Sequence, residues 1–338
     1  GLITGVSRFL AFIVQPPVGY LADRYPTRLF ALGGPLLVIV FISLSGIASH
    51  YFVLLVFIAL GSIGSSMFHP TVAGMIAPYS GRHFGLSMSL FNMGGTLSFG
   101  VGPLFISWFI ASFGLEASPW AMALGLAIMV FLYRAVPVPQ VEGLQDWGLW
   151  GSIKEVFGPV WRPIVLIWIV MVMRAFASQS FLTFLPVLYS RQGYTLISIG
   201  VVVASFTLAG ALSGLLAGHL SDRMGDKPIF MVAHALTTPC MYLMVLLPGD
   251  WIYPGAALTG FFALATLPLG VSAVQKLAPR GKSMASSLMT GLAYGTGGLL
   301  TPLTGKLADI FSIRPVLSVL AFVPLLTVGL ICFLPRKH

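Results

Sequence analysis

Charged residues are scarce in this chain of 338 residues. Asp, Glu, Lys and Arg together make up 8% of it, whereas hydrophobic residues make up 57%. A soluble domain carries about 25% charged residues. So few charges cannot cover a globular surface, but a lipid-facing surface needs no such cover. The composition therefore excludes an ordinary soluble domain and indicates a membrane protein.

Cysteine pairs and catalytic motifs are lacking as well. Cys240 and Cys332 both lie in apolar runs, without metal-ligand spacing or a reason to form a disulfide. No nucleophile motif or phosphate loop is present, so we expect no enzyme activity, no cofactor and no metal. The net charge of +9 comes from basic residues scattered singly between apolar runs, which argues against a nucleic-acid partner.

Apolar stretches long enough to cross about 30 Å of hydrocarbon recur along the whole chain. The pattern predicts eleven spanning helices, at residues 1–22, 29–48, 51–78, 84–113, 117–137, 162–190, 195–221, 228–247, 251–277, 283–311 and 312–334. The connections between them are short, except for the stretch 138–161.

Basic residues are distributed unequally between the two sides of these spans. Thirteen Lys and Arg fall on one side and only Arg191, Lys306 and Arg314 on the other. The positive-inside rule places the first group, and with it the C-terminus, in the cytoplasm. Gly1 then lies at the outer face, which is unusual for a complete protein. We therefore expect one further helix before Gly1 and twelve helices in the intact protein.

The stretch 138–161 divides the predicted spans into a first bundle over 1–137 (helices 2–6 of the expected twelve) and a second over 162–338 (helices 7–12). Trp147, Trp150 and Trp161 lie in it or at its end, among apolar residues and a few charges. That pattern suits a short helix at the cytoplasmic interface, where indole rings prefer to lie. A linker with aromatic anchors is an equally good interpretation.

A six-residue signature occurs twice. Gly19-Tyr-Leu-Ala-Asp23-Arg24 is repeated as Gly218-His-Leu-Ser-Asp222-Arg223, and 222 − 23 = 199. The same offset relates Pro103 to Pro302, each in a later Gly-rich span of its half. Two matches in register indicate a duplicated six-helix unit, the arrangement expected of parallel-repeat transporters.

The first copy, continued as Tyr-Pro-Thr-Arg28, resembles the loop motif between helices 2 and 3 of the major facilitator superfamily. Other segments are similar to the fosmidomycin-resistance family of bacterial drug exporters: Gln15-Pro-Pro-Val-Gly-Tyr, Gly64-Ser-Ser-Met-Phe-His69-Pro70, Gly81-Arg-His-Phe-Gly-Leu, Tyr294-Gly-Thr-Gly-Gly298 and Ala321-Phe-Val-Pro-Leu-Leu. The resemblance implies an all-α membrane protein with the major facilitator fold, two pseudo-symmetric six-helix bundles.

The repeated signature supplies the candidate gating residues. Gly19 and Gly218 remove side chains where a helix end must approach a neighbour closely. Asp23 can face the N-terminus of a neighbouring helix and pair with Arg24 or Arg28. The resemblance implies that this contact holds the two halves together on the cytoplasmic side. A plain topogenic loop is the alternative. The expected gating set is Gly19, Asp23, Arg24, Arg28, Gly218, Asp222 and Arg223.

Two arginines lie inside predicted spans, where charges are costly and functional by default. Arg8 is about 15 residues before Asp23, roughly 22 Å from the cytoplasmic boundary by helical rise. Arg174 lies near the middle of its span. Two cations from opposite halves that face one cavity would suit an anionic or phosphonate-like substrate. Alternatively, Arg8 extends outward to the interface and only Arg174 faces the cavity.

Other polar residues in the spans are candidates for the same cavity. Asn92, Gln179 and Tyr294 can contact substrate or form ordinary interhelical hydrogen bonds. His69 precedes Pro70, which should kink its helix, and is a candidate proton carrier or a hydrogen-bonded core residue. The Gly-rich run that begins at Gly94 partly resembles the fifth-helix motif of antiporter-type exporters, although Ser98 stands where that motif has Gly.

None of the nine acidic residues falls in the middle of a span. Proton antiporters usually protonate an embedded carboxylate, and the superfamily's common fourth-helix Arg is also missing between Leu54 and Ser66. Either a helix before Gly1 supplies the carboxylate, or His69 carries the proton, or coupling is not to protons. The resemblance favours the first.

We therefore expect a secondary active transporter that exports small anionic compounds in exchange for protons. A symporter importing a metabolite and a non-transporting sensor are the alternatives. The expected partners are small-molecule substrates, protons and the lipid bilayer, with the protein acting as a monomer in the bacterial cytoplasmic membrane.

Overall fold

The computed structural model describes residues 2–136, 148–247 and 249–334, and in these ranges it contains helices and no strands. Each of the eleven predicted spans is helical, which confirms the all-helical fold class. The helices are α1 (Leu2–Arg24), α2 (Thr27–Leu44), α3 (Tyr51–Ser80), α4 (Phe84–Phe113), α5 (Met122–Ala135), α6 (Gly148–Phe157), α7 (Trp161–Arg191), α8 (Leu196–Met224), α9 (Asp226–Leu246), α10 (Ile252–Ala265), α11 (Leu267–Leu277), α12 (Lys282–Ser287), α13 (Tyr294–Phe311), α14 (Ile313–Leu320) and α15 (Val323–Cys332).

Eight stretches of the described chain are long and apolar enough to cross a membrane. They include α2, all of α3 together with the first half of α4, α7, α8 and α9. Three predicted spans consist of consecutive shorter helices: α10 with α11, α12 with α13, and α14 with α15. Between α12 and α13 the chain forms a π-helical turn at Leu288–Ala293. Such turns interrupt α-helices and are frequent at functional sites.

The stretch 138–161 contains the short helix α6, and its residues 138–147 lie outside the described ranges. Ser152 and Val156 are buried, whereas Trp150 is 81% exposed. One face of α6 therefore packs on the protein and the other presents an indole outward. The helical interpretation of this stretch is confirmed for residues 148–157, and its location at a membrane surface stays a prediction.

The chain forms two compact units that do not follow the two sequence halves. Unit 1 comprises residues 1–79, 99–160 and 275–295, and unit 2 comprises residues 80–98, 161–274 and 296–338. Each unit thus contains a segment from the other half of the sequence. The predicted division into a first bundle over 1–137 and a second over 162–338, joined by 138–161, follows the sequence repeat and stays a prediction.

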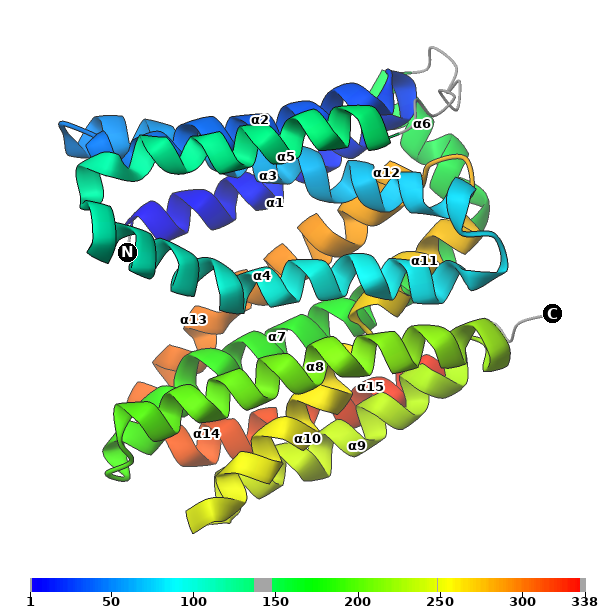
Figure 1. Ribbon diagram of the computed structural model, residues 1–338. Coiled ribbons are helices and arrows are strands. Elements are labelled where there is room, and N and C mark those ends of the chain that lie inside the picture. Colours follow the sequence, from blue (N-terminus) through cyan, green and yellow to red (C-terminus); the bar gives the residue numbers. More distant parts are fainter. Residues whose placement is uncertain (1, 137–147, 248, 335–338) are drawn as a thin grey trace. The chain divides into compact units, whose positions relative to one another are not determined.

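Unit 1 is built on close helix approaches at glycine. In Figure 1, α2 and α5 run side by side along this unit. A Cβ on Gly125 of α5 would lie 2.8 Å from the side chain of Ile39 on α2. A Cβ on Gly34 of α2 would lie 2.6 Å from the carbonyl oxygen of Gly64 on α3. Small residues let these backbones meet, as helix packing in lipid requires.

Unit 2 contains a buried core formed by α7, α8, α9, α10, α14 and α15. Its fully enclosed side chains include Phe181, Phe206, Met241 and Leu317. Tyr189 is buried in this cluster and donates its hydroxyl to the carbonyl oxygen of Met244, at 2.9 Å. This tightly packed bundle is the setting for the buried arginine described below.

Candidate gating and transport site

Asp23 lies at the end of α1 and is only 4% exposed. Its two carboxylate oxygens accept hydrogen bonds from the backbone N–H groups of Ser283, at 2.9 Å, and Met284, at 2.8 Å. These are N–H groups of the first turn of α12, which have no partner within their own helix. The positive end of the helix dipole also favours a carboxylate here. Asp23 therefore joins a helix of the first sequence half to a helix of the second, inside unit 1.

Gly19 lies one turn before Asp23 on the same face of α1. A Cβ at this position would lie 2.6 Å from Ser287 Oγ and 2.7 Å from the carbonyl oxygen of Ser283. No ordinary contact is that short, so α1 and α12 approach each other this closely only because position 19 carries no side chain. The Asp23 contact, defined by Asp23, Gly19, Ser283 and Met284, depends on that approach.

The second copy of the signature forms the equivalent contact inside unit 2. Asp222 on α8 accepts hydrogen bonds from the N–H groups of Gly85, at 2.7 Å, and Leu86, at 3.1 Å, in the first turn of α4. A Cβ on Gly218 would collide with Ser89 Oγ and with the carbonyl oxygen of Gly85. We call this the Asp222 contact. Asp222 is half-buried, so water screens it more than Asp23.

The two contacts occupy matching places in the repeat. The carboxylates are 222 − 23 = 199 residues apart, and the first N–H donors are 283 − 85 = 198 residues apart. In each case the signature helix of one half meets the start of a helix of the other half. The duplication inferred from sequence is therefore visible as a duplicated interaction.

The arginines of the signature have different partners. Arg24 donates to the hydroxyl of Tyr20 at 2.8 Å. Arg28, which was expected near Asp23, instead hydrogen-bonds the carbonyl oxygen of Tyr133 on α5, and its guanidinium lies 4.3 Å from the ring centroid of that residue. Arg223 is exposed. Arg28 thus links α2 to α5 and is not part of the Asp23 contact.

Gln275 is a member of the Asp23 contact region that sequence reasoning missed. It is 2% exposed on α11, and its amide nitrogen lies 3.0 Å from the carbonyl oxygen of Ala73 on α3 and within hydrogen-bonding distance of Ser286 Oγ. A Cβ on Gly74 would collide with Ser283 Oγ. The helix α3 therefore joins α1 in holding α11 and α12. The sequence signal that could have identified Gln275 is a single amide side chain within an apolar span.

The linker helix α6 packs on the turn that precedes α12. Arg280 forms an ion pair with Glu155 at 3.7 Å, and a Cβ on Gly281 would lie 2.5 Å from Val156. The Arg280 side chain is 79% exposed, so this ion pair contributes little energy. The apolar contact of Val156 with the turn is the more durable link between α6 and the start of α12.

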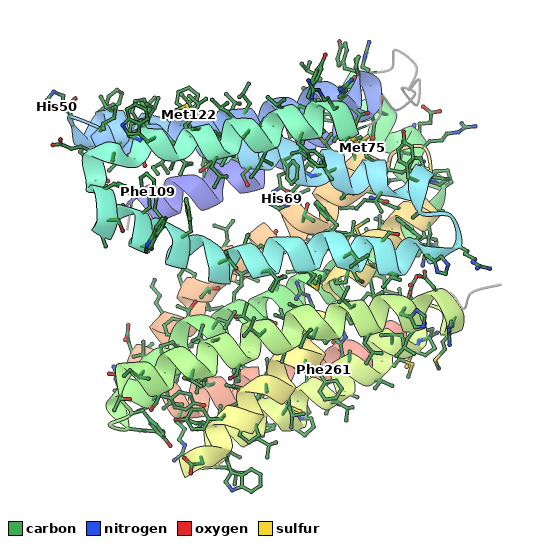
Figure 2. The ribbon with its side chains drawn as sticks, in the orientation of Figure 1. His50, His69, Met75, Phe109, Met122 and Phe261 are labelled. Atoms are coloured by element: carbon green, nitrogen blue, oxygen red, sulfur yellow. The ribbon has the colours of Figure 1, made fainter. Side chains whose placement is uncertain are left out.

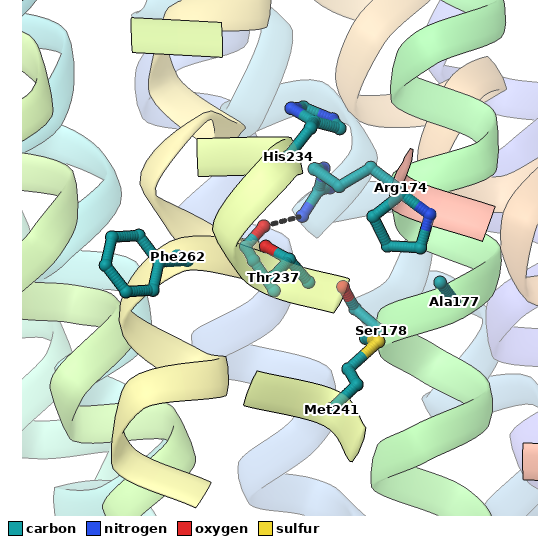
Figure 3. Close-up of a pocket in the computed structure, with 9 residues that line it drawn as sticks. Arg174, Ala177, Ser178, His234, Thr237, Met241 and Phe262 are labelled. Carbon is teal, nitrogen blue, oxygen red and sulfur yellow. Dashed lines mark hydrogen bonds between the residues drawn. The ribbon is translucent and has the colours of Figure 1, made fainter. Parts of the chain in front are cut away.

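Arg174, the expected substrate contact of the second half, is enclosed in unit 2. It is 3% exposed and its Nη1 lies 3.4 Å from the carbonyl oxygen of Ala263 on α10. Figure 3 shows its side chain in a small cavity beside His234 of α9. In this state its guanidinium does not reach solvent. Arg8 lies on α1, and its side chain is outside the described residues.

The three remaining polar candidates, Asn92, Gln179 and Tyr294, have different surroundings. Asn92 donates to the carbonyl oxygen of Met88 one turn back, at 2.9 Å, so its amide nitrogen bonds its own helix. A Cβ on Gly298 would lie 2.8 Å from Gln179 Oε1, which places Gln179 between α7 and α13 in unit 2. Tyr294 is 47% exposed. Contact of these residues with substrate stays a prediction.

His69 lies midway along α3 in unit 1, as Figure 2 shows, and the helix continues through Pro70. It is partly buried, and its ring lies 5.7 Å from that of Phe68. Elsewhere in unit 1, Thr290 in the π-helical turn donates its hydroxyl to Gln15 Oε1 at 2.9 Å. Gln15 is 7% exposed and is another buried amide that the sequence did not single out as a site residue.

These features define a polytopic helical membrane protein with a duplicated interhelical contact at the ends of its signature helices. The sequence model of the Major Facilitator Superfamily matches residues 1–302 and 195–338. The chain belongs to the Major Facilitator Superfamily and is a transporter of that fold.

Two curated relatives align with nearly the whole chain. The fosmidomycin resistance protein of Escherichia coli (strain K12) is 26% identical over 344 residues, which cover 100% of this chain and 84% of the relative. The uncharacterized MFS-type transporter YfnC of Bacillus subtilis (strain 168) is 24% identical over 99% of this chain and 83% of its own length.

Solved structures show the same fold. The human organic anion transporter MFSD10 superposes with a TM-score of 0.80 at 18% identity, covering 98% of this chain and 83% of that one. The Escherichia coli fucose:proton symporter FucP gives a TM-score of 0.80 at 14% identity over 100% of this chain and 91% of its own. The predicted superfamily and fold are therefore confirmed.

Proposed function

We propose that this transporter is a proton-coupled antiporter that exports small anionic compounds from a bacterial cytoplasm by alternating access. The observation that carries the mechanism is the pair of matching carboxylate contacts, Asp23 with the start of α12 and Asp222 with the start of α4. Each ties one sequence half to the other. Breaking both would release the halves on the side where the signatures lie.

The energy of these contacts suits a reversible gate. A hydrogen bond to a charged group is worth about 1.5–3 kcal/mol net, and each carboxylate accepts two. Differential binding of a few kcal/mol is what a ligand needs to move a two-state equilibrium from one side to the other. The contacts are therefore strong enough to favour a closed cytoplasmic side and weak enough for substrate or protons to reopen it.

The anionic substrate class is supported by the cations in the spans and by the relatives. Arg8 and Arg174 are positive charges within predicted spans, where a cation attracts anions through the low dielectric. The fosmidomycin resistance protein and an organic anion transporter are among the similar proteins. Arg8, Asn92, Gln179 and Tyr294 are the proposed substrate contacts, and Arg174 joins them only if it leaves the carbonyl oxygen of Ala263.

A proton-coupled symporter is the second candidate, and one observation favours it. Arg174 and His234 line the same enclosed cavity. Because two positive charges repel at low dielectric, an anion that neutralises Arg174 would help His234 to hold a proton. Anion and proton would then bind together, which is the requirement for symport.

Inverted membrane vesicles that contain the full-length protein distinguish the candidates. With an acidic lumen, addition of an anionic substrate such as fosmidomycin should release protons from the lumen if substrate and proton are exchanged. Symport would instead move protons in the same direction as the substrate. Vesicles lacking the protein are the control. No substrate-dependent proton movement at any imposed gradient would exclude both proton-coupled candidates.

A further inference from the structure

A small enclosed cavity lies inside unit 2, among α7, α9, α10 and α15. Its volume is about 10 Å³, about the room that one water molecule needs. Figure 3 shows the side chains that surround it. The polar ones come from two helices: Arg174 and Ser178 from α7, and His234 and Thr237 from α9. The other lining residues are apolar: Ala177, Met241, Phe262, Ala263 and Pro324. A water molecule is held in such a cavity only where it meets two or more polar groups, so the place for one is where the four polar side chains converge.

The tautomer of His234 follows from its hydrogen bond. Nδ1 lies 2.9 Å from the carbonyl oxygen of Phe230, one turn back on α9. A carbonyl oxygen can only accept, so Nδ1 carries the hydrogen and a neutral ring has its lone pair on Nε2. The residue is only 3% exposed, and its buried Nε2 has no hydrogen-bond partner among the residues that the structure describes. The ring therefore presents a basic nitrogen to the protein interior.

The hydroxyl of Ser178 also needs a hydrogen-bond partner. Ser178 lies one turn after Arg174 on α7 and is 4% exposed, and within the described part of the chain its hydroxyl has no hydrogen-bond partner. Leaving a buried polar atom unsatisfied costs about 1–3 kcal/mol. A water molecule in the cavity can donate to His234 Nε2 and accept from Ser178 or from the guanidinium of Arg174. One water thus satisfies two orphaned groups.

The charges that face His234 can be named helix by helix. α7 contributes Arg174, and the other lining residues of α7 and α9 are Ala177, Ser178, Thr237 and Met241. α10 contributes Phe262 and Ala263, and α15 contributes Pro324, none of which titrates. Among the described lining residues, Arg174 is therefore the one fixed charge that a proton on His234 would meet.

We propose that this cavity is an internal proton-binding site, in which a water molecule bridges Arg174 and His234 and the proton is accepted by His234 Nε2. A proton bound there gives two neighbouring cations, so Arg174 has to shift or be neutralised. Both residues are 3% exposed, so the proton exchanges with solvent only when the helices around the cavity part. A carrier needs that occlusion to couple a proton to its conformational cycle.

This inference rests on the proton coupling of the proposed function, by antiport or by symport, and names the group that would carry the coupled proton in place of an embedded carboxylate. The sequence directed attention to His69 and gave no signal for His234. Proton binding at His234 can be observed without any transport. Its test is therefore separable from the test of antiport.

The direct test is ¹⁵N NMR of the full-length protein labelled at histidine, in detergent or lipid. The chain has six histidines, and the His234→Gln variant identifies the signal. We expect its Nε2 to change from an unprotonated to a protonated nitrogen as the pH falls from 8 to 3, and the midpoint to differ by one pH unit or more in Arg174→Gln. A ring that stays neutral throughout, or a midpoint unaffected by Arg174→Gln, would overturn the proposal.

The transport test uses the same variant. His234→Gln should reduce substrate-driven proton movement at least tenfold. His50→Gln, a change at an exposed histidine in the α2–α3 connection, is the matched control and should leave that proton movement unchanged. Undiminished proton movement in His234→Gln would overturn the assignment. If wild-type protein moves no substrate while His234 titrates as described, the antiport proposal fails and the proton site stands.

Discussion

The substitution Asp23→Asn removes one negative charge from the start of α12. The carboxylate accepts two charge-assisted hydrogen bonds, from the N–H groups of Ser283 and Met284. An asparagine retains one acceptor oxygen, and its amide nitrogen would face the second N–H. Exchanging two bonds of about 1.5–3 kcal/mol for one of about 0.5–1.5 kcal/mol loses roughly 2.5–4.5 kcal/mol. At 1.4 kcal/mol for each factor of ten, the contact should open at least about 60 times more often.

Hydrogen–deuterium exchange reports this opening at the atoms concerned. The amides of Ser283 and Met284 should exchange at least about 60-fold faster in Asp23→Asn, whereas the amides of Gly85 and Leu86 keep their wild-type rates. Asp222→Asn should show the reverse pattern with a smaller increase, because Asp222 is half-buried and more screened.

Asp309→Asn, at an exposed aspartate of α13, is the control and should change neither pair. Unaltered exchange of Ser283 and Met284 in Asp23→Asn would refute the reasoning. The carboxylate would then contribute nothing to holding α12.

Three other substitutions test neighbouring parts of the same region, and a fourth, Gly94→Ala in unit 2, is a control. Gly19→Ala places a Cβ 2.6 Å from Ser287 Oγ, so it should lower the melting temperature by several degrees and speed the exchange of the same amides as Asp23→Asn. A Cβ at Gly94 meets no described atom within 4 Å, so Gly94→Ala should be neutral or slightly stabilising in a thermal melt. Gln275→Leu removes the bond to α3, and a loss of about 1–3 kcal/mol should appear as faster exchange in α11 and α12. Arg280→Gln breaks an exposed ion pair and should change the melting temperature by less than a degree.

Much of the fold could be predicted because its signals are long and periodic. Eleven apolar runs predicted eleven helical segments, and the repeated signature placed a carboxylate at the end of two of them. The expectation that Asp23 can face a helix N-terminus followed from the charge of that terminus alone. The partner helix could not be predicted, because the pairing of α1 with α12 and of α8 with α4 joins residues more than 130 positions apart.

The polar contacts inside the bundles were harder to foresee for a physical reason. Gln275 and His234 are single polar residues in apolar runs, and their role depends on which backbone or side chain lies opposite in space. Arg174 was foreseen as a functional cation, but its sequence position does not show which way a helix face turns. In the structure it faces α9 and α10 within unit 2. The π-helical turn at Leu288–Ala293 likewise has no sequence signature.

The central claim is that the Asp23 contact opens and closes during transport. Spin labels at positions 25 and 280, both exposed and on either side of that contact, allow the distance between the end of α1 and the start of α12 to be measured by pulsed electron paramagnetic resonance. Wild-type protein should show a short-distance population that lengthens when substrate is added, and Asp23→Asn should show the longer population without substrate. A single unchanged distance in wild type and variant, with and without substrate, would contradict the account.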